Sequence, residues 1–277
     1  MDLSISIVIY KNNEKILMQA VNSVLASEGV TFKLYIVDNS PTDDLKHLFQ
    51  VDSRIEYIFN NANVGYGSGH NIIMKDKKKI GRYHLVLNPD IFFDKDILKK
   101  LIAYMDDHAD VGNIIPRVIV PNSERDCAVC KLLPTPKDWF VRMFIPIKAW
   151  RKRSTYEYQM LFADFSKTMN VPFLSGCFMF LRSSVFDEIG YFDENIFMYA
   201  EDTDLNRRIY KKYRTLYYPV LRIYHYGAAE SHKKLKLMWI SIKSCVYYLN
   251  KWGWFFDRER KIINKNTIKK YTVRDVK

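Results

Sequence analysis

Short apolar runs alternate with helical stretches along the first 120 residues of the chain. The runs typical of β-strands cover residues 4–10, 32–37, 54–59 and 83–87. From Leu17 to Leu25, apolar side chains recur every three or four residues, which predicts a helix. A second helix is expected after Asp94, which we take as its N-cap. Strand–helix alternation of this kind predicts a largely parallel sheet whose ligand lies beyond the carboxyl ends of the strands.

The regular pattern is interrupted once and then resumes. A strand is predicted over residues 111–120, and Pro116 is expected to break it. From about residue 121 to residue 171, prolines recur, and aromatic residues mingle with lysines and arginines. We interpret this stretch as an insertion with a short amphipathic helix rather than as a second domain. A strand-like run over residues 173–181 resumes the pattern, and a helix is expected to follow Glu201.

The C-terminal tail carries its own helical pattern. Apolar and aromatic residues recur at helical spacing between Leu235 and Phe256, and Lys236, Lys243 and Asn250 lie on the opposite side. Two interpretations fit this pattern. The helix packs on the rest of the protein, or it lies with its tryptophans on an anionic lipid surface. Both remain open, and each can hold for a different part of the helix.

These patterns suggest one domain followed by a tail. The expected parts are a domain over residues 1–232, interrupted by a basic aromatic insertion of about 121–171, and a basic amphipathic helical tail over 233–277.

Composition narrows the class of protein. Hydrophobic residues make up 48% of the 277 residues, enough for a packed core. The longest apolar runs are far shorter than the roughly 20 residues that span a bilayer, and the N-terminus does not resemble a signal peptide. We therefore expect a cytoplasmic protein. Its 43 lysines and arginines exceed its 31 aspartates and glutamates, and the formal charge of +12 favours polyanionic partners.

Two polar segments follow predicted strands in the first part of the chain. Asp38 ends the second strand, where its carboxylate can accept a hydrogen bond from a base or ribose, or simply cap a turn. The segment Asn60–Asn71 is rich in glycine, which allows backbone N–H groups to approach a phosphate-bearing ligand. It is not the dinucleotide-binding fingerprint, because His70 replaces the third glycine of G-x-G-x-x-G.

Carboxylates mark two further segments. Asp90, in Asn88-Pro89-Asp90, directly follows a predicted strand, where it can bind a divalent cation that bridges two phosphates. Glu201, Asp202 and Asp204 lie ahead of a predicted helix and can include a general base for an acceptor hydroxyl. Helix capping is the alternative explanation for these acids. The chain has no G-x-x-x-x-G-K-[ST] motif, which excludes ordinary P-loop chemistry.

Taken together and in order, these segments resemble family-2 glycosyltransferases of the GT-A fold, in particular the bacterial rhamnosyltransferase branch. The matching segments are Val8–Tyr10, Val37–Ser40, Asn60–Asn71, Leu87–Asp90, Ser175–Met179, Gly190–Glu194 and Met198–Asp204. The resemblance extends over about residues 4–232 and implies an α/β, Rossmann-like GT-A domain with a mostly parallel central sheet flanked by helices. It also implies that this catalytic domain over residues 1–232 has a nucleotide-binding half of about 1–120 and an acceptor-binding, catalytic half of about 172–232. The family's D-x-D position is Asn88-Pro89-Asp90 here, with one carboxylate in place of two.

The resemblance also implies a role for individual residues. Asp202 matches the catalytic base of an inverting, single-displacement transfer, and Asp90 and His225 match the ligands of Mg²⁺ or Mn²⁺. Residues expected to contact the donor nucleotide are Tyr10, Asp38, Asn63, Gly65, Asn71 and Asn88. Residues expected to support the acceptor side are Glu201, Asp204 and Gly176.

The implied substrates are a nucleotide sugar and a lipid-linked glycan. The first choice of donor is dTDP-L-rhamnose, with UDP-sugars as the alternative. The acceptor is expected to be a lipid-diphosphate-linked glycan for O-antigen, capsule or another surface polysaccharide, on the cytoplasmic face of an anionic bacterial membrane. The alternative from another class is a non-catalytic nucleic-acid or polyanion binder, which the basic aromatic stretches suggest. That alternative leaves the ordered acidic segments unexplained, so no nucleic-acid partner is expected.

Overall fold

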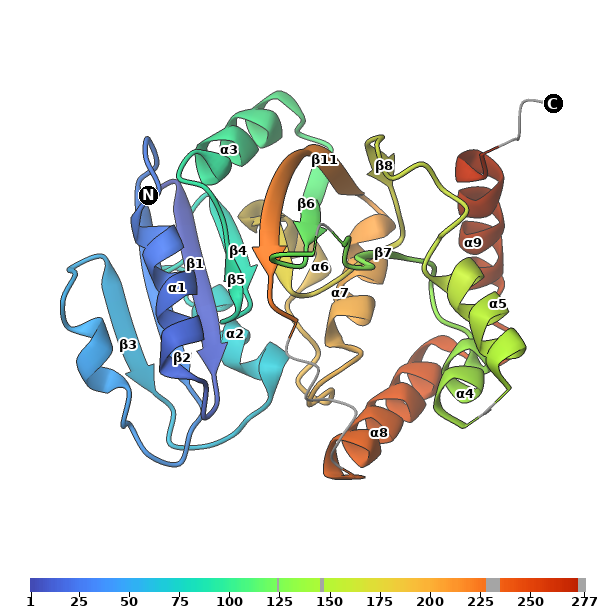
Figure 1. The fold of residues 1–277 in the computed structure, drawn as a ribbon, viewed down its shortest axis with the longest axis horizontal. Coiled ribbons are helices and arrows are strands. Elements are labelled where there is room, and N and C mark those ends of the chain that lie inside the picture. The colour runs from blue at the N-terminus through green and yellow to red at the C-terminus, as the bar shows by residue number, and fades with distance from the viewer. Residues whose placement is uncertain (124, 145–146, 228–234, 274–277) are drawn as a thin grey trace.

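A computed structural model describes residues 1–123, 125–144, 147–227 and 235–273 (Figure 1). Within these residues, nine strands form one sheet: β1 (Leu3–Ile9), β2 (Phe32–Asp38), β3 (Ile55–Phe59), β4 (Tyr83–Leu87), β5 (Ile91–Phe92), β6 (Val111–Ile119), β8 (Met169–Asn170), β10 (Phe178–Arg182) and β11 (Arg214–His225). Their order is β3-β2-β1-β4-β10-β6-β11-β5, and β8 also pairs with β11. A separate two-stranded sheet joins β7 (Cys130–Lys131) to β9 (Phe173–Leu174).

The sheet is mixed but mostly parallel. Strands β1, β2, β3 and β4 pair in parallel, and so do β6 and β11, whereas β10 runs antiparallel to its neighbours β4 and β6. The carboxyl ends of β1, β2, β4, β6 and β11 therefore meet at one edge, which we call the carboxyl edge, and the first residue of β10 lies there too. This arrangement confirms the predicted α/β class.

Helices cover both faces of the sheet because its strands are apolar on both sides. Ile5 and Ile7 of β1 pack with α1 (Glu14–Leu25) and α3 (Ile97–Asp107), while Val8 points to the opposite face. That second face carries α2 (Tyr66–Met74), α6 (Phe186–Ile189) and α7 (Glu201–Tyr210). Two short 3₁₀ turns, η1 (Lys46–Phe49) and η2 (Ser183–Val185), complete this part of the chain.

Two local predictions were wrong. The N-cap of α3 is Asp96 rather than Asp94, and only the backbone carbonyl of Asp94 contacts the helix start, accepting from the Ile97 N–H at 3.2 Å. Strand β6 continues through Pro116. The proline is tolerated because the pairing of β6 with β11 is irregular there, with residues 219–221 forming a bulge opposite it.

The insertion and the tail each contain two helices where one was expected. The insertion forms α4 (Pro136–Phe144) and α5 (Lys148–Tyr158), and the tail forms α8 (Leu235–Trp252) and α9 (Arg258–Tyr271). The tail helix ends at Gly253, whose φ of 102° favours glycine, instead of continuing to Phe256. The expected boundary between residues 232 and 233 lies outside the described residues.

The tail packs against the rest of the protein through the C-terminal part of α8. Tyr248 and Leu249 are buried against Ile196 and Ala200, and the Tyr248 ring lies 5.5 Å from that of Trp139 in α4. Figure 1 shows α4, α5 and α9 together at the right of the view, with α8 below them. The packing interpretation therefore holds for this part of α8. Trp239, by contrast, is 59% exposed.

Candidate functional site

The carboxyl edge of the sheet brings together residues that lie far apart in the sequence. Asn88 and Asp90 follow β4, Gly176 precedes β10, and His225 ends β11. The backbone joins these segments, because the Asn88 N–H donates to the Cys177 carbonyl at 2.9 Å and the Tyr226 N–H donates to the Asp90 carbonyl at 3.1 Å. Strand pairing therefore fixes the relative positions of these residues.

Asp90 and His225 form a close pair at this edge. The Asp90 Oδ1 and His225 Nε2 atoms are 3.1 Å apart, and each side chain is about 15% exposed, at 14% and 16% respectively. Burial alone would lower the pKa of His225. The hydrogen bonds to Asp90 and Cys127, together with the nearby Cys177, outweigh this effect and raise the pKa to about 11. Neighbouring ligands of an octahedral cation, at bonds of ~2.1 Å and a right angle, lie ~3.0 Å apart. With its pKa at about 11, His225 is protonated and forms an ion pair with Asp90, so a divalent cation could bind both side chains only by displacing that proton.

The candidate base, Asp202, lies in the first turn of α7 and is held by two backbone N–H groups. Gly176 donates to its Oδ2 atom and Thr203 to its Oδ1 atom, both at 2.8 Å. A Cβ atom at Gly176 would lie 2.7 Å from the Cβ of Asp202, so only glycine permits this approach.

Tyr66, at the start of α2, links the two sides of the site. Its hydroxyl lies 2.9 Å from Asn88 Oδ1 and 2.8 Å from the Gly176 carbonyl oxygen. Burial, and after it the charge of Glu201, raises the pKa of Tyr66 well above its usual value, so the hydroxyl stays protonated. Because Gly176 also binds Asp202, Tyr66 helps to fix the loop that positions the candidate base. No role was expected for Tyr66 from the sequence.

The residues next to Asp202 differ from it in environment. Glu201 is buried, and burial followed by the charge of Asp202 raises its pKa to about 8. The burial of Glu201 therefore favours its protonated form near neutral pH. Tyr199 has a φ of 87°, which is strained for a non-glycine residue and fits a functional loop.

A cleft of about 970 Å³ opens between these residues and the helices of the insertion and tail. Asn88, Gly176, Asp202 and His225 line one side of it. The other side is lined by residues of the insertion and of α8, which are Lys131, Trp139, Arg151, Thr155, Tyr158, Gln159, Leu237, Met238 and Ser241. These residues had no assigned role, because their meeting with Asp202 depends on how α4, α5 and α8 dock.

Three residues expected to contact the nucleotide lie near the ends of β1, β2 and β3, outside this lining. Tyr10 is 48% exposed, and Asn63 is also exposed. Asp38 is only 1% exposed, and its oxygens accept from the Ser40 N–H at 2.8 Å and the Tyr57 hydroxyl at 2.7 Å. Contact between Asp38 and a nucleoside stays a prediction, and it requires this carboxylate to become accessible.

Two other expected nucleotide contacts have structural roles instead. The Gly65 N–H donates to Asn63 Oδ1, and a Cβ at Gly65 would lie 2.4 Å from the Phe197 carbonyl oxygen. The glycine therefore serves close packing rather than the approach of a phosphate. Asn71 is fully buried, donates to the Phe192 carbonyl and to Glu194, and accepts from the Phe192 N–H. Its amide has no room for a ligand.

Asp204 is also misassigned to the acceptor side. It is fully buried and faces α8, where it binds Lys251 and the Trp252 indole N–H, both at 2.8 Å, and it pairs with Arg208 within α7. The acidic cluster thus combines a residue on the cleft, Asp202, with a residue that fastens the tail.

The sequence of the chain matches known glycosyltransferases. Residues 4–190 match the profile of the family described as Glycosyl transferase family 2. The chain is 30% identical over 205 residues to Low-salt glycan biosynthesis hexosyltransferase Agl10 of Haloferax volcanii, which covers 73% of this chain and 60% of that protein. It is 29% identical over 212 residues to Rhamnosyltransferase WbbL of Escherichia coli (strain K12), covering 73% and 76% respectively.

Solved structures share the fold. The TarS crystal structure from S. aureus superposes with a TM-score of 0.61 at 16% identity, covering 97% of this chain and 43% of TarS. GalNAc-T7 in a crystal structure with UDP, GalNAc and Mn²⁺ gives a TM-score of 0.61 at 17% identity, covering 81% of this chain and 43% of that one. These likenesses show a GT-A fold. In both comparisons the matched region is less than half of the solved chain.

Proposed function

Because the chain belongs to glycosyl transferase family 2 and is therefore a glycosyltransferase, we propose that it transfers L-rhamnose from dTDP-L-rhamnose to a lipid-diphosphate-linked glycan in bacterial surface polysaccharide synthesis. A UDP-sugar is the second candidate donor, since TarS has been crystallised with UDP-GlcNAc. The names of two relatives support rhamnose: the E. coli protein, and N-acetylglucosaminyl-diphospho-decaprenol L-rhamnosyltransferase of Mycobacterium tuberculosis, 41% identical over 59 residues.

One observation carries the proposed chemistry: a carboxylate fixed by backbone N–H groups shares a cleft with His225, which is paired with Asp90 at the carboxyl edge. Asp202 would accept the proton of the acceptor hydroxyl as that oxygen attacks the anomeric carbon. Displacement in one step would invert the anomeric centre. Gly176 and Thr203 hold the carboxylate through both of its oxygens, so the base loses little freedom on reaching the reactive geometry.

Asp90 and His225 would hold Mg²⁺ or Mn²⁺. Within the described residues, no group of three histidine, cysteine, aspartate or glutamate side chains could hold a metal ion. Two protein ligands still suffice for a cation that completes its shell with phosphate oxygens and water. Such a cation would neutralise charge on the departing nucleoside diphosphate. Because the two side chains form an ion pair with each other, the cation would have to displace the His225 proton to bind them both.

The acceptor would enter from the side of α4, α5 and α8. Lys131 and Arg151 line that part of the cleft and provide positive charge suited to an acceptor diphosphate. No described helix is both long enough and apolar enough to cross a bilayer. We propose peripheral association with the anionic inner face of the cell membrane, which the exposed Trp239 and the excess of basic residues support.

A screen of donor hydrolysis across nucleotide sugars tests the proposal. We expect release of dTDP from dTDP-L-rhamnose to exceed release of UDP from UDP-sugars, and to require Mg²⁺ or Mn²⁺. A ligand that binds the native state must also raise the melting temperature, so dTDP with the cation should do so. A preference for a UDP-sugar would mean that this sugar nucleotide, and not dTDP-L-rhamnose, is the donor. If neither dTDP nor UDP stabilised the protein, the proposed site would be contradicted.

A further inference from the structure

The turn between α8 and α9 exposes aromatic side chains that a soluble protein would bury. We call residues 253–257 the α8–α9 corner. Trp254 is 38% exposed, Phe255 77% and Phe256 99%. Single exposed apolar residues are ordinary, but three consecutive aromatic ones at a turn are characteristic of an interaction surface.

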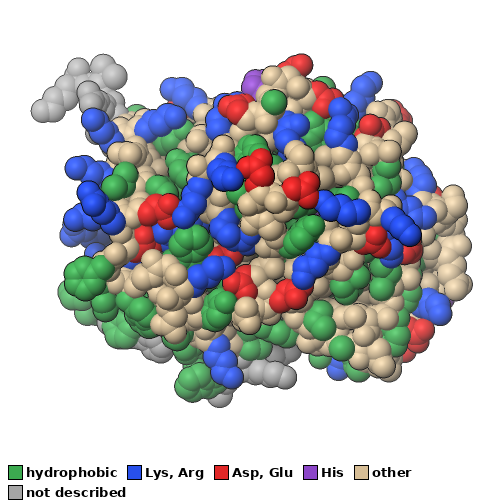
Figure 2. All heavy atoms as spheres, turned by 180° about the vertical axis from the view of Figure 1, so that it is seen from behind, with side chains coloured by type: hydrophobic (Ala, Val, Ile, Leu, Met, Phe, Trp, Pro, Cys, Tyr) green, Lys and Arg blue, Asp and Glu red, His purple; other side chains and the backbone are tan. Residues whose placement is uncertain are grey.

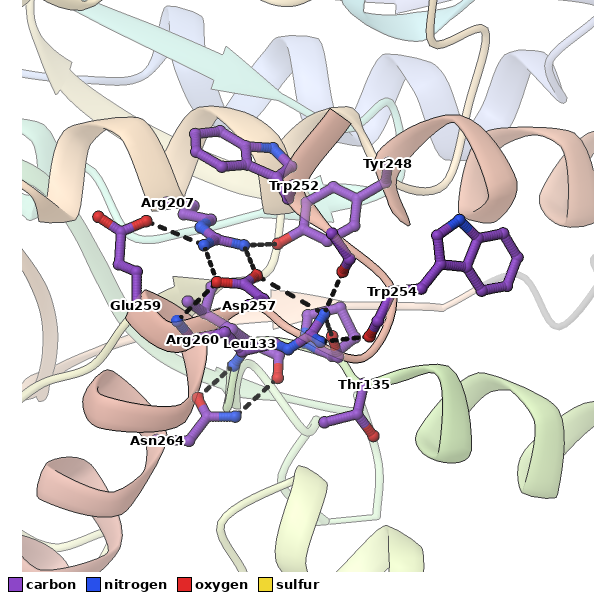
Figure 3. Close-up of polar contacts among 12 residues, drawn as sticks. Leu133, Thr135, Arg207, Tyr248, Trp252, Trp254, Asp257, Glu259, Arg260 and Asn264 are labelled. Atoms are coloured by element: carbon purple, nitrogen blue, oxygen red, sulfur yellow. Dashed lines mark hydrogen bonds and ion pairs between the residues drawn. The ribbon is translucent and has the colours of Figure 1, made fainter. Parts of the chain in front are cut away.

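The corner is rigid because a buried ion pair holds it to α7. Arg207 donates both Nη groups to the two oxygens of Asp257, at 2.6 and 2.8 Å, and the two side chains are 1% and 3% exposed. Figure 3 shows Trp252, Tyr248 and Glu259 around the same guanidinium, which lies 4.1 Å from the Trp252 ring centre. Bidentate pairing of this kind fixes both distance and orientation.

A second arginine fixes the backbone of the corner itself. Arg260 donates to the carbonyls of Gly253 at 3.2 Å and Trp254 at 2.6 Å, and also to that of Pro134 ahead of α4. In Figure 3 the Trp254 ring points away from this cluster while its carbonyl faces Arg260. The exposed rings therefore project from a backbone that is held in place, and their exposure is not a consequence of a loose terminus.

Basic residues continue from the corner along α9. Arg258 and Lys261 are exposed and lie one helical turn apart, and Lys265 and Lys269 follow at the same spacing. The acidic residue of this stretch, Glu259, is already paired with Arg207 and Lys211. Figure 2 shows lysine and arginine side chains beside hydrophobic ones along the edge of the molecule formed by these C-terminal helices, at the left of that view.

We propose that the α8–α9 corner is the membrane-docking element of this protein, with Phe255 and Phe256 inserted at the surface of an anionic bilayer and Arg258 and Lys261 against its headgroups. Protruding aromatics beside cations suit a lipid interface, which needs no shape complementarity. Because α7 carries both Arg207 and Asp202, the corner also fixes the distance of the candidate base from the bilayer. The inference rests on the proposed function only in taking a lipid-linked acceptor as the reason for docking.

Vesicle sedimentation of the full chain tests the proposal. The wild type should bind vesicles of equimolar phosphatidylglycerol and phosphatidylcholine, more weakly at high salt. The variant Phe255→Ser/Phe256→Ser should bind about tenfold or more weakly, because each phenylalanine loses its apolar burial. Arg258→Gln/Lys261→Gln should bind about tenfold more weakly to these vesicles and unchanged to pure phosphatidylcholine. Equal melting temperatures would establish that every variant folds.

The matched control is Val51→Ser, at a side chain that is 77% exposed, as Phe255 is, in the segment before β3. It should bind vesicles as the wild type does. Absence of wild-type binding at low salt, or equal binding by Phe255→Ser/Phe256→Ser, would overturn the proposal. The proposal would also be overturned if sedimentation velocity showed that the corner mediates a dimer and vesicle binding did not depend on the corner. Vesicle binding does not depend on transferase activity, so an inactive protein that still binds through the corner would contradict the proposed function alone.

Discussion

At the scale of single residues, the site depends on groups that position others. The Tyr66 hydroxyl is shared between Asn88 and the Gly176 carbonyl, and the Gly176 N–H in turn holds Asp202. One hydroxyl proton serves two acceptors, so Tyr66 couples the loop before β10 to the end of β4. Tyr66 is a positioning residue in this arrangement, and its effect reaches the reaction through Asp202.

We expect Tyr66→Phe to lower kcat about tenfold while leaving the dissociation constant of the donor nearly unchanged. The variant leaves two partly buried acceptors without their donor, a loss of roughly 1 kcal/mol that loosens the Gly176 loop. Steady-state kinetics and calorimetry measure the two quantities. Tyr35→Phe is the control, because its hydroxyl binds the Lys79 carbonyl away from the cleft. Equal turnover in the two variants would remove the positioning role.

We expect Asp90→Ala to weaken binding of the nucleoside diphosphate only when Mg²⁺ or Mn²⁺ is present. The cation carries the attraction between the diphosphate and this carboxylate, so a chelator should abolish the difference between variant and wild type. Calorimetry with and without chelator measures it. Equal weakening in both conditions would mean that Asp90 only shapes the turn after β4.

The residue types in the sequence predicted the chemistry of the candidate site better than they predicted the orientation of its side chains. The spacing of Asp90 from His225 follows from the pairing of β5 with β11, and neither of these strands was predicted from the sequence. Gly65 and Asn71 were misassigned because glycine and asparagine serve tight packing as well as ligand binding. Only the positions of Phe197 and Phe192 distinguish these uses, and the sequence does not give them.

At the scale of elements, α7 serves both the site and the architecture. Its first turn carries Asp202, its buried Asp204 binds α8, and Arg207 near its end binds Asp257. Periodicity predicted that a helix follows Glu201 but not that it fastens the tail. The break after α8 was missed because Trp252 and Phe256 keep helical spacing across Gly253, and spacing alone does not distinguish a buried aromatic from an exposed one.

Arg207→Met should lower the free energy of unfolding by about 3 kcal/mol, because the buried Asp257 loses its bidentate partner and keeps only Arg260, at 3.7 Å. Denaturant unfolding monitored by tryptophan fluorescence measures the loss. Lys77→Ala breaks the ion pair with Asp187, whose side chains are both 64% exposed, and should leave stability unchanged within error. If Arg207→Met unfolds with the stability of Lys77→Ala, the α7–α9 ion pair does not hold the tail in place.

At the scale of the whole molecule, the candidate site residues that follow the strands lie together at the carboxyl edge of one sheet. Strand–helix alternation predicted this edge and the positions of Asn88 and Asp90 at it, whereas His225 was expected there only from the resemblance to family-2 glycosyltransferases. The far wall of the cleft was not predictable in the same way. Residues such as Trp139, Arg151 and Met238 reach it because α4, α5 and α8 dock beside α7, and docking depends on buried pairs that no local pattern reveals.

The most direct test of the account is Asp202→Asn, measured for sugar transfer and for donor affinity in the same preparation. We predict that transfer is lost, because a general base supplies about 10²–10⁴-fold of the rate, while donor affinity stays close to that of the wild type. The control Asp187→Asn, at an exposed ion pair, should transfer normally. An Asp202→Asn variant that keeps more than about a tenth of wild-type turnover would contradict the assignment of Asp202 as the base.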